Sequence, residues 1–104
     1  MKNGQYIAER KFLGVDVNGD NINITVGIGI PYESKEYNSW ACPVKIEGLY
    51  NKLADQHGID SWQAVRLSQK LVASLLEGFI EKGGKIYLFD ENEEMTKEEI
   101  NEFF

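Results

Sequence analysis

Residues 21–30, NINITVGIGI, alternate between aliphatic side chains and polar or glycine positions. A repeat of two residues puts every second side chain on one side of an extended chain, so the pattern predicts a strand with one buried face. That face consists of Ile22, Ile24, Val26, Ile28 and Ile30. Just before the strand, Asn18-Gly19 supplies residues that readily adopt the left-handed dihedrals of a tight turn. We therefore expect residues 5–14 to pair with this strand as an antiparallel hairpin.

A third strand is expected at residues 39–47, after Pro31 and a polar loop at 32–38. Its apolar side is formed by Trp40, Cys42, Val44 and Ile46. Pro43 has no amide hydrogen to donate, so the strand should lie at a sheet edge or carry a bulge there. Residues 48–59 show little periodicity, apart from a candidate helical turn at 49–56.

The longest predicted element is a helix that begins after Asp60 and ends at Gly83-Gly84, with Gly84 available to cap its end. Asp60 and Gln63 have the spacing of a capping box, in which side chains satisfy the free amides of the first turn. One broad arc of the helix is apolar: Ala64, Val65, Leu67, Leu71, Val72, Leu75, Leu76, Phe79 and Ile80. The arc covers more than half the circumference, so we expect it to cover the sheet and to meet a second surface. A second copy of the chain, in a homodimer, is one candidate for that surface.

Residues 85–89, KIYLF, predict a further strand, and Thr96 with Glu99 repeats the capping-box spacing before a short terminal helix. Ile100, Phe103 and Phe104 give that helix an apolar side. The order strand, strand, strand, helix, strand, helix favours an α+β fold, in which an antiparallel sheet of about four strands has the long helix packed on one face. Because no repeat or low-complexity linker interrupts the sequence, residues 1–104 are expected to form a single domain.

The net charge of −6 is confined to one end of the chain. Residues 1–89 contain ten basic and ten acidic residues, whereas residues 90–104 contain seven acids against Lys97. These acids are Asp90, Glu91, Glu93, Glu94, Glu98, Glu99 and Glu102. Such a cluster is either a solvated surface that aids solubility or a docking surface that steers a basic protein into contact. Nucleic acid is not an expected partner, because the cluster repels phosphates and no stretch interleaves basic and aromatic residues.

The composition also bears on the compartment. The longest uncharged stretch, residues 21–32, is too short and too rich in Gly and Asn to cross a bilayer, and the first ten residues do not resemble a signal peptide. One cysteine cannot form an internal disulfide. We therefore expect a cytoplasmic protein that does not associate with membranes.

Cys42 and His57 are the only cysteine and the only histidine. A nucleophilic cysteine needs a neighbouring base and surroundings that favour the thiolate, and the sequence does not place His57 against it. On the apolar side of its strand, Cys42 is expected to pack as a small hydrophobe. A structural zinc site needs four Cys or His ligands, so no metal is expected. The sequence predicts no catalytic residue and no cofactor.

Four motifs together resemble a bacterial family of proteins of about a hundred residues and unknown function. They are IAER at 7–10, I-G-x-P at 28–31, W-x-C-P-V-x-I-x-G-L at 40–49 and G-I-D-S-x-Q-A at 58–64. The resemblance covers most of residues 7–80 and implies a small intracellular protein. It brings no catalytic residues, and the acidic segment at 90–104 lies outside it.

Two functional hypotheses follow from these patterns. In the first, the protein is a small, acidic, non-catalytic binding protein, most concretely a bacterial immunity protein that uses its acidic residues to neutralise a basic toxin. In the second, it is a small-ligand-binding or enzymatic domain with a pocket between helix and sheet. That pocket would be lined by Trp40, Cys42, His57 and Trp62. Convergence of these four side chains on one cavity would favour the second hypothesis.

Overall fold

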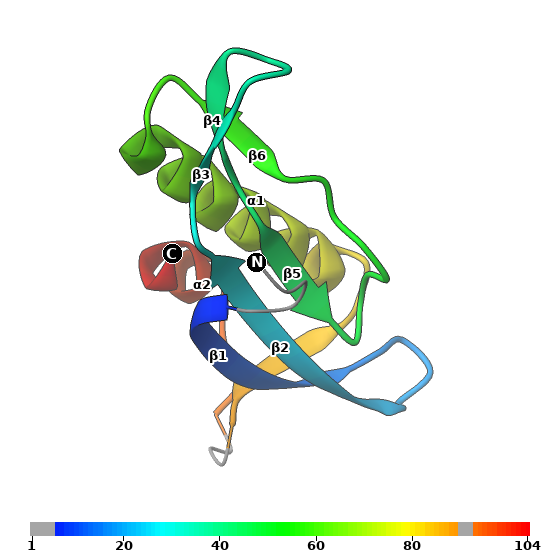
Figure 1. Ribbon diagram of the computed structural model, residues 1–104. Coiled ribbons are helices and arrows are strands. Elements are labelled where there is room, and N and C mark those ends of the chain that lie inside the picture. Colours follow the sequence, from blue (N-terminus) through cyan, green and yellow to red (C-terminus); the bar gives the residue numbers. More distant parts are fainter. Residues whose placement is uncertain (1–5, 90–92) are drawn as a thin grey trace.

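The computed structural model describes residues 6–89 and 93–104. In chain order the elements are β1 (Tyr6–Val15), β2 (Asn21–Gly29), β3 (Tyr32–Ser34), β4 (Ser39–Cys42), β5 (Val44–Glu47), β6 (Gln56–Gly58), α1 (Ser61–Glu81), β7 (Lys85–Leu88) and α2 (Lys97–Phe103). The expected fold class is confirmed: an α+β fold with an antiparallel four-stranded sheet, one long helix and a short C-terminal helix (Figure 1).

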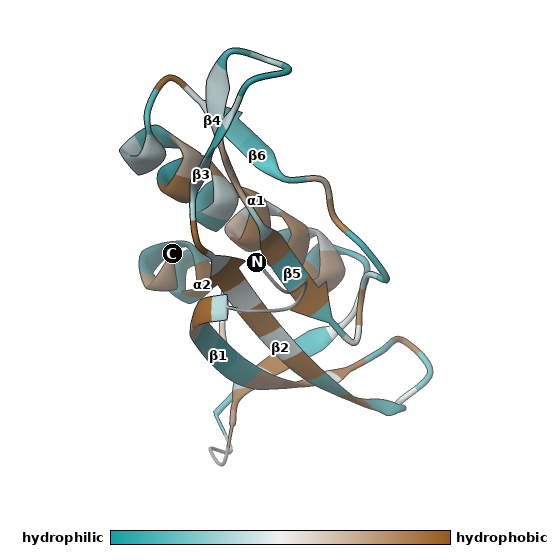
Figure 2. Ribbon diagram, in the orientation of Figure 1, coloured by the Kyte–Doolittle hydropathy of each residue, from teal (hydrophilic) through white to brown (hydrophobic). Residues whose placement is uncertain are grey.

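The main sheet has the strand order β5-β2-β1-β7, and all three strand pairs are antiparallel. The β1–β2 hairpin is confirmed, with Val15 opposite Asn21 across the turn. The Asp16 carboxylate accepts hydrogen bonds from the backbone amides of Asn18 and Asp20, at 2.9 and 3.0 Å, which fixes the turn. Figure 2 shows hydrophobic and hydrophilic residues alternating along β2 and β5, as a sheet with one buried face requires.

A second sheet, with the order β3-β4-β6, was not anticipated from the sequence. The polar loop expected at 32–38 begins with β3, and the helical turn expected at 49–56 is wrong, since β6 starts at Gln56. Both strands are three residues long, so they are too short to carry a periodic pattern and exist only through their pairing with β4. The single strand expected at 39–47 is divided at Pro43 into β4 and β5, which belong to different sheets.

α1 begins as predicted. The Asp60 carboxylate accepts from the Gln63 amide at 2.8 Å, and the Gln63 side chain accepts from the Ile59 amide at 2.7 Å. At the other end, Gly83 rather than Gly84 takes the left-handed conformation, at φ +101°, which an L side chain would resist.

The wide apolar arc of α1 is explained within one chain. The helix contacts both sheets and α2, so its half-buried residues Leu71, Leu75, Phe79 and Ile80 pack around the core. Its fully buried positions are Ala64, Ser68, Val72, Ala73 and Leu76. The three small residues among them let α1 approach the sheets closely. The homodimer suggested by the arc stays a prediction.

Beyond β7 the chain is tied back to the core. The Met95 amide donates to the Ile86 carbonyl at 2.7 Å, and the side chains of Met95 and Ile100 are buried. The ring of Phe104 packs against Phe12 of β1, with ring centroids 6.1 Å apart. α2 therefore lies against α1 and β1 and completes the layer that covers the inner face of the main sheet (Figure 1). In the described part of the chain, neither helix has the length and apolar character needed to cross a membrane.

Candidate functional site

The acidic C-terminal segment is held on a fixed base. Asp90 and Glu91 lie outside the described residues, whereas Glu93 and Glu94 are exposed and follow β7. On α2, Glu98, Glu99 and Glu102 are exposed. Because Met95 and Ile100 are buried beneath the segment, its acids project from a docked turn and helix.

Glu99 differs from the other acids because it belongs to a complete capping box. Its carboxylate accepts from the Thr96 amide at 2.9 Å, and the Thr96 hydroxyl accepts from the Glu99 amide at 3.1 Å. The spacing of these two residues predicted this arrangement. The Glu99 side chain is therefore engaged in starting α2, so its removal would change folding as well as surface charge.

Lys97 is the single basic residue of the segment, and its ammonium lies 3.5 Å from the Glu81 carboxylate of α1. Both side chains are exposed, so the pair contributes little to stability. The Lys97 ammonium is nevertheless directed toward α1 and not toward the acids that follow it in the sequence. Among the described residues of the segment, four acids have carboxylates that form no hydrogen bond or ion pair: Glu93, Glu94, Glu98 and Glu102. We call these four residues the acidic surface.

Cys42 is fully buried at the end of β4, as the packing interpretation predicted. Its thiol lies 3.5 Å from the Pro43 carbonyl and 3.7 Å from the Gly29 carbonyl, so it has acceptors for its weak donor. Burial raises the pKa of the Cys42 thiol above its ordinary value, although a hydrogen bond from Ser68 acts in the opposite direction. A buried thiol that resists ionisation is a poor nucleophile.

The other three residues of the expected pocket do not converge with Cys42. The His57 ring is exposed on β6, where it forms a 2.9 Å hydrogen bond with the Ser39 hydroxyl and an edge contact with Tyr37. Trp40 lines an open hollow of about 200 Å³, and Trp62, 81% exposed, lines a different one of about 430 Å³ beside α1. Of the four cavities described among residues 6–89 and 93–104, none is lined by more than one of these four side chains.

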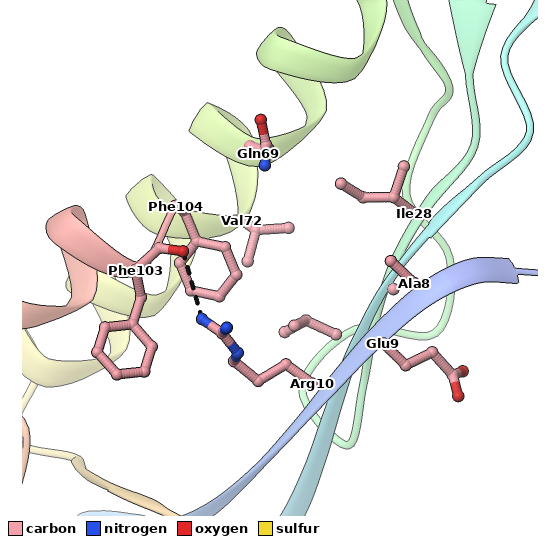
Figure 3. A pocket seen from close by; sticks show the side chains of 10 residues that line it. Ala8, Glu9, Arg10, Ile28, Gln69, Val72, Phe103 and Phe104 are labelled. Atoms are coloured by element: carbon pink, nitrogen blue, oxygen red, sulfur yellow. Dashed lines mark hydrogen bonds between the residues drawn. The ribbon is translucent and has the colours of Figure 1, made fainter.

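A cavity between helix and sheet does exist, at a place that the sequence interpretation missed. It has a volume of about 160 Å³ and lies between β1, β2, α1 and the end of α2. Figure 3 labels eight of the residues that line it: Ala8, Glu9, Arg10, Ile28, Gln69, Val72, Phe103 and Phe104. We call it the Arg10 cavity.

Arg10 is the one cationic side chain in these walls. Its guanidinium donates to the Phe103 carbonyl at 3.3 Å and lies over the Phe103 and Phe104 rings, 4.7 and 5.8 Å from their centroids. The sequence contained a signal for this position. Alternation along β1 puts Arg10 on the same side as Ala8 and Phe12, and Arg10 lies opposite the buried Val26 of β2. Arg10 is itself exposed to solvent, so its charge is carried at the open side of the cavity.

The four motifs noted in the sequence lie mostly at positions that form the fold. Gly58 is an example, because a Cβ there would lie 2.7 Å from the Ala64 amide in the first turn of α1. Asp60 and Gln63 cap the same turn. Val44 and Ile46 belong to the core. The first motif contributes two charged residues, Glu9 and Arg10, to the lining of a cavity.

Within the described residues, no group of three or more His, Cys, Asp and Glu side chains is placed to hold a metal ion. Every buried side-chain nitrogen or oxygen described there has a hydrogen-bond partner. The geometry therefore offers two candidate sites, which are the acidic surface and the Arg10 cavity.

The architecture is that of an α+β domain with two sheets and an acidic C-terminal segment. The chain belongs to the family of a domain of unknown function, DUF6968, whose sequence model matches residues 8–96. No curated protein and no solved structure matches the chain. The matched region includes both sheets and α1, whereas α2 follows it.

Proposed function

We propose that this protein is a non-catalytic binding protein whose acidic surface docks a basic protein. In its most concrete form it is a bacterial immunity protein that neutralises a basic toxin in the cytoplasm. The observation that carries the proposal is the placement of charge: residues 90–104 hold the whole net charge of −6, and the rest of the chain is balanced. Clustered charge of one sign attracts a partner of the opposite sign and raises its association rate.

The anchoring of the segment supports this role. Met95 and Ile100 are buried, and the capping box starts α2 at a defined residue, so the acids do not have to be ordered when a partner binds. Glu98 and Glu102 are four residues apart in α2 and lie on the same side of the helix. A surface ordered before binding loses less conformational entropy on association.

A second candidate function, the binding of a small ligand, is favoured by one observation. The cavity between α1 and the main sheet is lined mainly by apolar side chains, together with Arg10, Glu9 and Gln69, and a mostly apolar lining with a few polar groups is usual in a small-molecule site. It lies at Arg10 and not near Trp40 and Cys42. The buried, protonated thiol of Cys42 gives no support to an enzymatic version of this hypothesis.

Co-expression with a toxin tests the immunity proposal. An immunity gene ordinarily follows the gene of its toxin, so the product of the gene directly upstream is expressed in cells with and without this protein. We expect the wild-type chain to restore growth. The variant with Glu93, Glu94, Glu98 and Glu102 each changed to Gln should fail to do so. Glu99 is kept because it caps α2.

A matched control removes the same amount of charge elsewhere. Asp20→Asn, Glu33→Gln, Glu36→Gln and Glu77→Gln change four acids outside the segment, and this variant should protect cells as the wild type does. Equal protection by both quadruple variants would exclude the acidic surface as the docking site. An upstream product that is harmless, or toxic whether or not this protein is present, would contradict the immunity function itself.

A further inference from the structure

We propose that the Arg10 cavity binds a small carboxylate with an apolar body, such as an aromatic or short aliphatic acid. The inference goes beyond protein docking, because the cavity and the acidic surface use different side chains. It depends on three properties of the cavity: its apolar walls, its size and the position of one guanidinium.

The walls are apolar on three sides. Val26 and Val72 are buried core residues of β2 and α1, and Ile28 lies two residues beyond Val26, on the same face of β2. Phe104 closes the side formed by α2, and Ala8 lines the side formed by β1 (Figure 3). An apolar group placed here is removed from water, which provides the general driving force for binding.

The volume limits the size of the ligand. A cavity of about 150 Å³ lined by aliphatic and aromatic side chains accommodates benzene. The Arg10 cavity has about 160 Å³ and is open to solvent. A single ring or a chain of a few methylenes fits its apolar part, while a polar group attached to that body remains at the open side.

The guanidinium selects the charge of that polar group. Arg10 has five N–H donors, and the structure shows one hydrogen bond from them, to the Phe103 carbonyl. Its planar fork matches the two oxygens of a carboxylate. Glu9 also lines the cavity, but its carboxylate points away from Arg10 (Figure 3). That carboxylate forms an ion pair with Lys45 and does not compensate the charge of Arg10. Gln69 adds an amide, which can donate a further hydrogen bond.

Calorimetric titration of the full chain with sodium benzoate tests the proposal. We expect saturable binding of one benzoate per chain. Benzamide has the same ring and a similar shape but no charge, and it should bind at least about tenfold more weakly, since hydrogen bonds between charged groups are stronger than neutral ones. Hexanoate is the aliphatic probe. The proposal is overturned if neither acid binds saturably, or if benzamide binds as tightly as benzoate.

A variant of Arg10 and a matched control at Lys11 locate the site. Arg10→Met retains the apolar stem and should weaken benzoate binding about tenfold or more. Lys11→Met removes the same charge from the adjacent position, whose side chain lies on the opposite face of β1, and should leave affinity within about twofold. Equal effects of these two changes would show that only overall charge matters and would refute a specific site.

Arg10→Met also removes a contact with α2, so a second variant fills the cavity without removing that contact. Ala8→Leu fills the cavity from β1 and leaves Arg10 and Phe103 unchanged, and it should abolish benzoate binding. Unaltered binding to this variant would place benzoate elsewhere and refute the proposal. The variant with Glu93, Glu94, Glu98 and Glu102 changed to Gln should bind benzoate like the wild type, which separates the failure of this inference from failure of the docking proposal.

Discussion

The guanidinium of Arg10 in β1 donates a hydrogen bond to the backbone carbonyl of Phe103 in α2, and it lies over the Phe103 ring at 4.7 Å. The contact joins residues 93 positions apart. It connects the first strand to the last helix, so one side chain links the main sheet, the cavity and the segment that carries the acidic surface. Stability of α2 is therefore coupled to β1 as well as to the core.

The capping box is expected to stabilise α2. Thr96→Ala removes the hydroxyl that accepts from the Glu99 amide and should lower the free energy of unfolding by about 0.5–2 kcal/mol. Urea denaturation followed by circular dichroism measures the change. Thr25→Ala, at a half-buried position of β2, is a control for loss of a threonine. A Thr96→Ala variant as stable as the wild type would show that the box contributes nothing measurable.

Cys42 is expected to behave as a packing residue. Cys42→Ser places a hydroxyl in the core and should cost about 1–3 kcal/mol in the free energy of unfolding, whereas Cys42→Ala should cost less. Because burial raises the pKa of the thiol, it should react slowly with a disulfide reagent in the native protein at neutral pH and rapidly after unfolding. Fast modification of the native thiol would contradict its burial.

Two adjacent leucines of α1 should differ in their contribution. Leu76 is fully buried, and Leu76→Ala should cost about 2–5 kcal/mol in unfolding free energy through lost contacts and a cavity. Leu75 is half-buried, so Leu75→Ala should cost less. Denaturant titrations of both variants provide the comparison, and the reverse order would indicate that α1 is rotated about its axis relative to this structure.

Tyr32 should make stability sensitive to alkaline pH. Its hydroxyl donates to the Asp55 carboxylate, and this hydrogen bond, with burial and the charge of Asp55, raises the pKa of Tyr32 from its ordinary value of 10 to about 12. A folded-state pKa above the unfolded value means that the phenol stabilises the fold fully below pH 10 and that this contribution is lost as the pH rises towards 12.

The difference in unfolding free energy between the wild type and Tyr32→Phe isolates this group from other alkaline titrations. It should be constant below pH 10 and decrease between pH 10 and 12. Tyr37→Phe is the matched control, because Tyr37 is an exposed tyrosine whose hydroxyl bonds to no carboxylate of the described residues. A Tyr32→Phe difference that does not change across this window would exclude the Asp55 interaction in solution.

If the acidic surface docks a basic protein, its contribution should appear mainly in the association rate. Added salt should slow association of the wild type, because charges separated by more than the Debye length of about 8 Å at physiological ionic strength are screened. The variant with Glu93, Glu94, Glu98 and Glu102 changed to Gln should associate more slowly and lose most of this salt dependence. Stopped-flow measurements with the partner at several salt concentrations provide the test, and equal rates at low salt would contradict docking through this surface.

Several features of the fold are determined by short-range sequence patterns. The alternation at 21–30 predicted β2, and Asn18-Gly19 predicted the hairpin to β1. Asp60 with Gln63 and Thr96 with Glu99 predicted where both helices begin. In each case the physical cause acts within a few residues: side chains alternate on an extended chain, and a polar side chain satisfies free amides one turn away.

Other features were decided by tertiary packing. β3 and β6 have only three residues each and form because β4 provides partners on both sides. Pro43 was expected at an edge or bulge, and β5, which follows it, is an edge strand of the main sheet. The sequence did not indicate that the chain passes at Pro43 from one sheet to the other, with both sheets packed on α1. Trp40, Cys42, His57 and Trp62 suggested one pocket by residue type alone. Pairing places β4 beside β6, yet Cys42 is buried, His57 is exposed, and Trp40 and Trp62 line different hollows.

The Arg10 cavity shows most clearly which features local sequence determines and which depend on tertiary packing. Alternation along β1 determines that Arg10 shares a side with Ala8 and Phe12. It does not determine that α2 returns from the other end of the chain to place Phe103 and Phe104 beside the guanidinium. That arrangement depends on the burial of Ile100 and Met95 between distant elements. The sequence alone thus determines the local elements and the sides of their residues, whereas the cavity exists only because long-range packing brings four of those elements together.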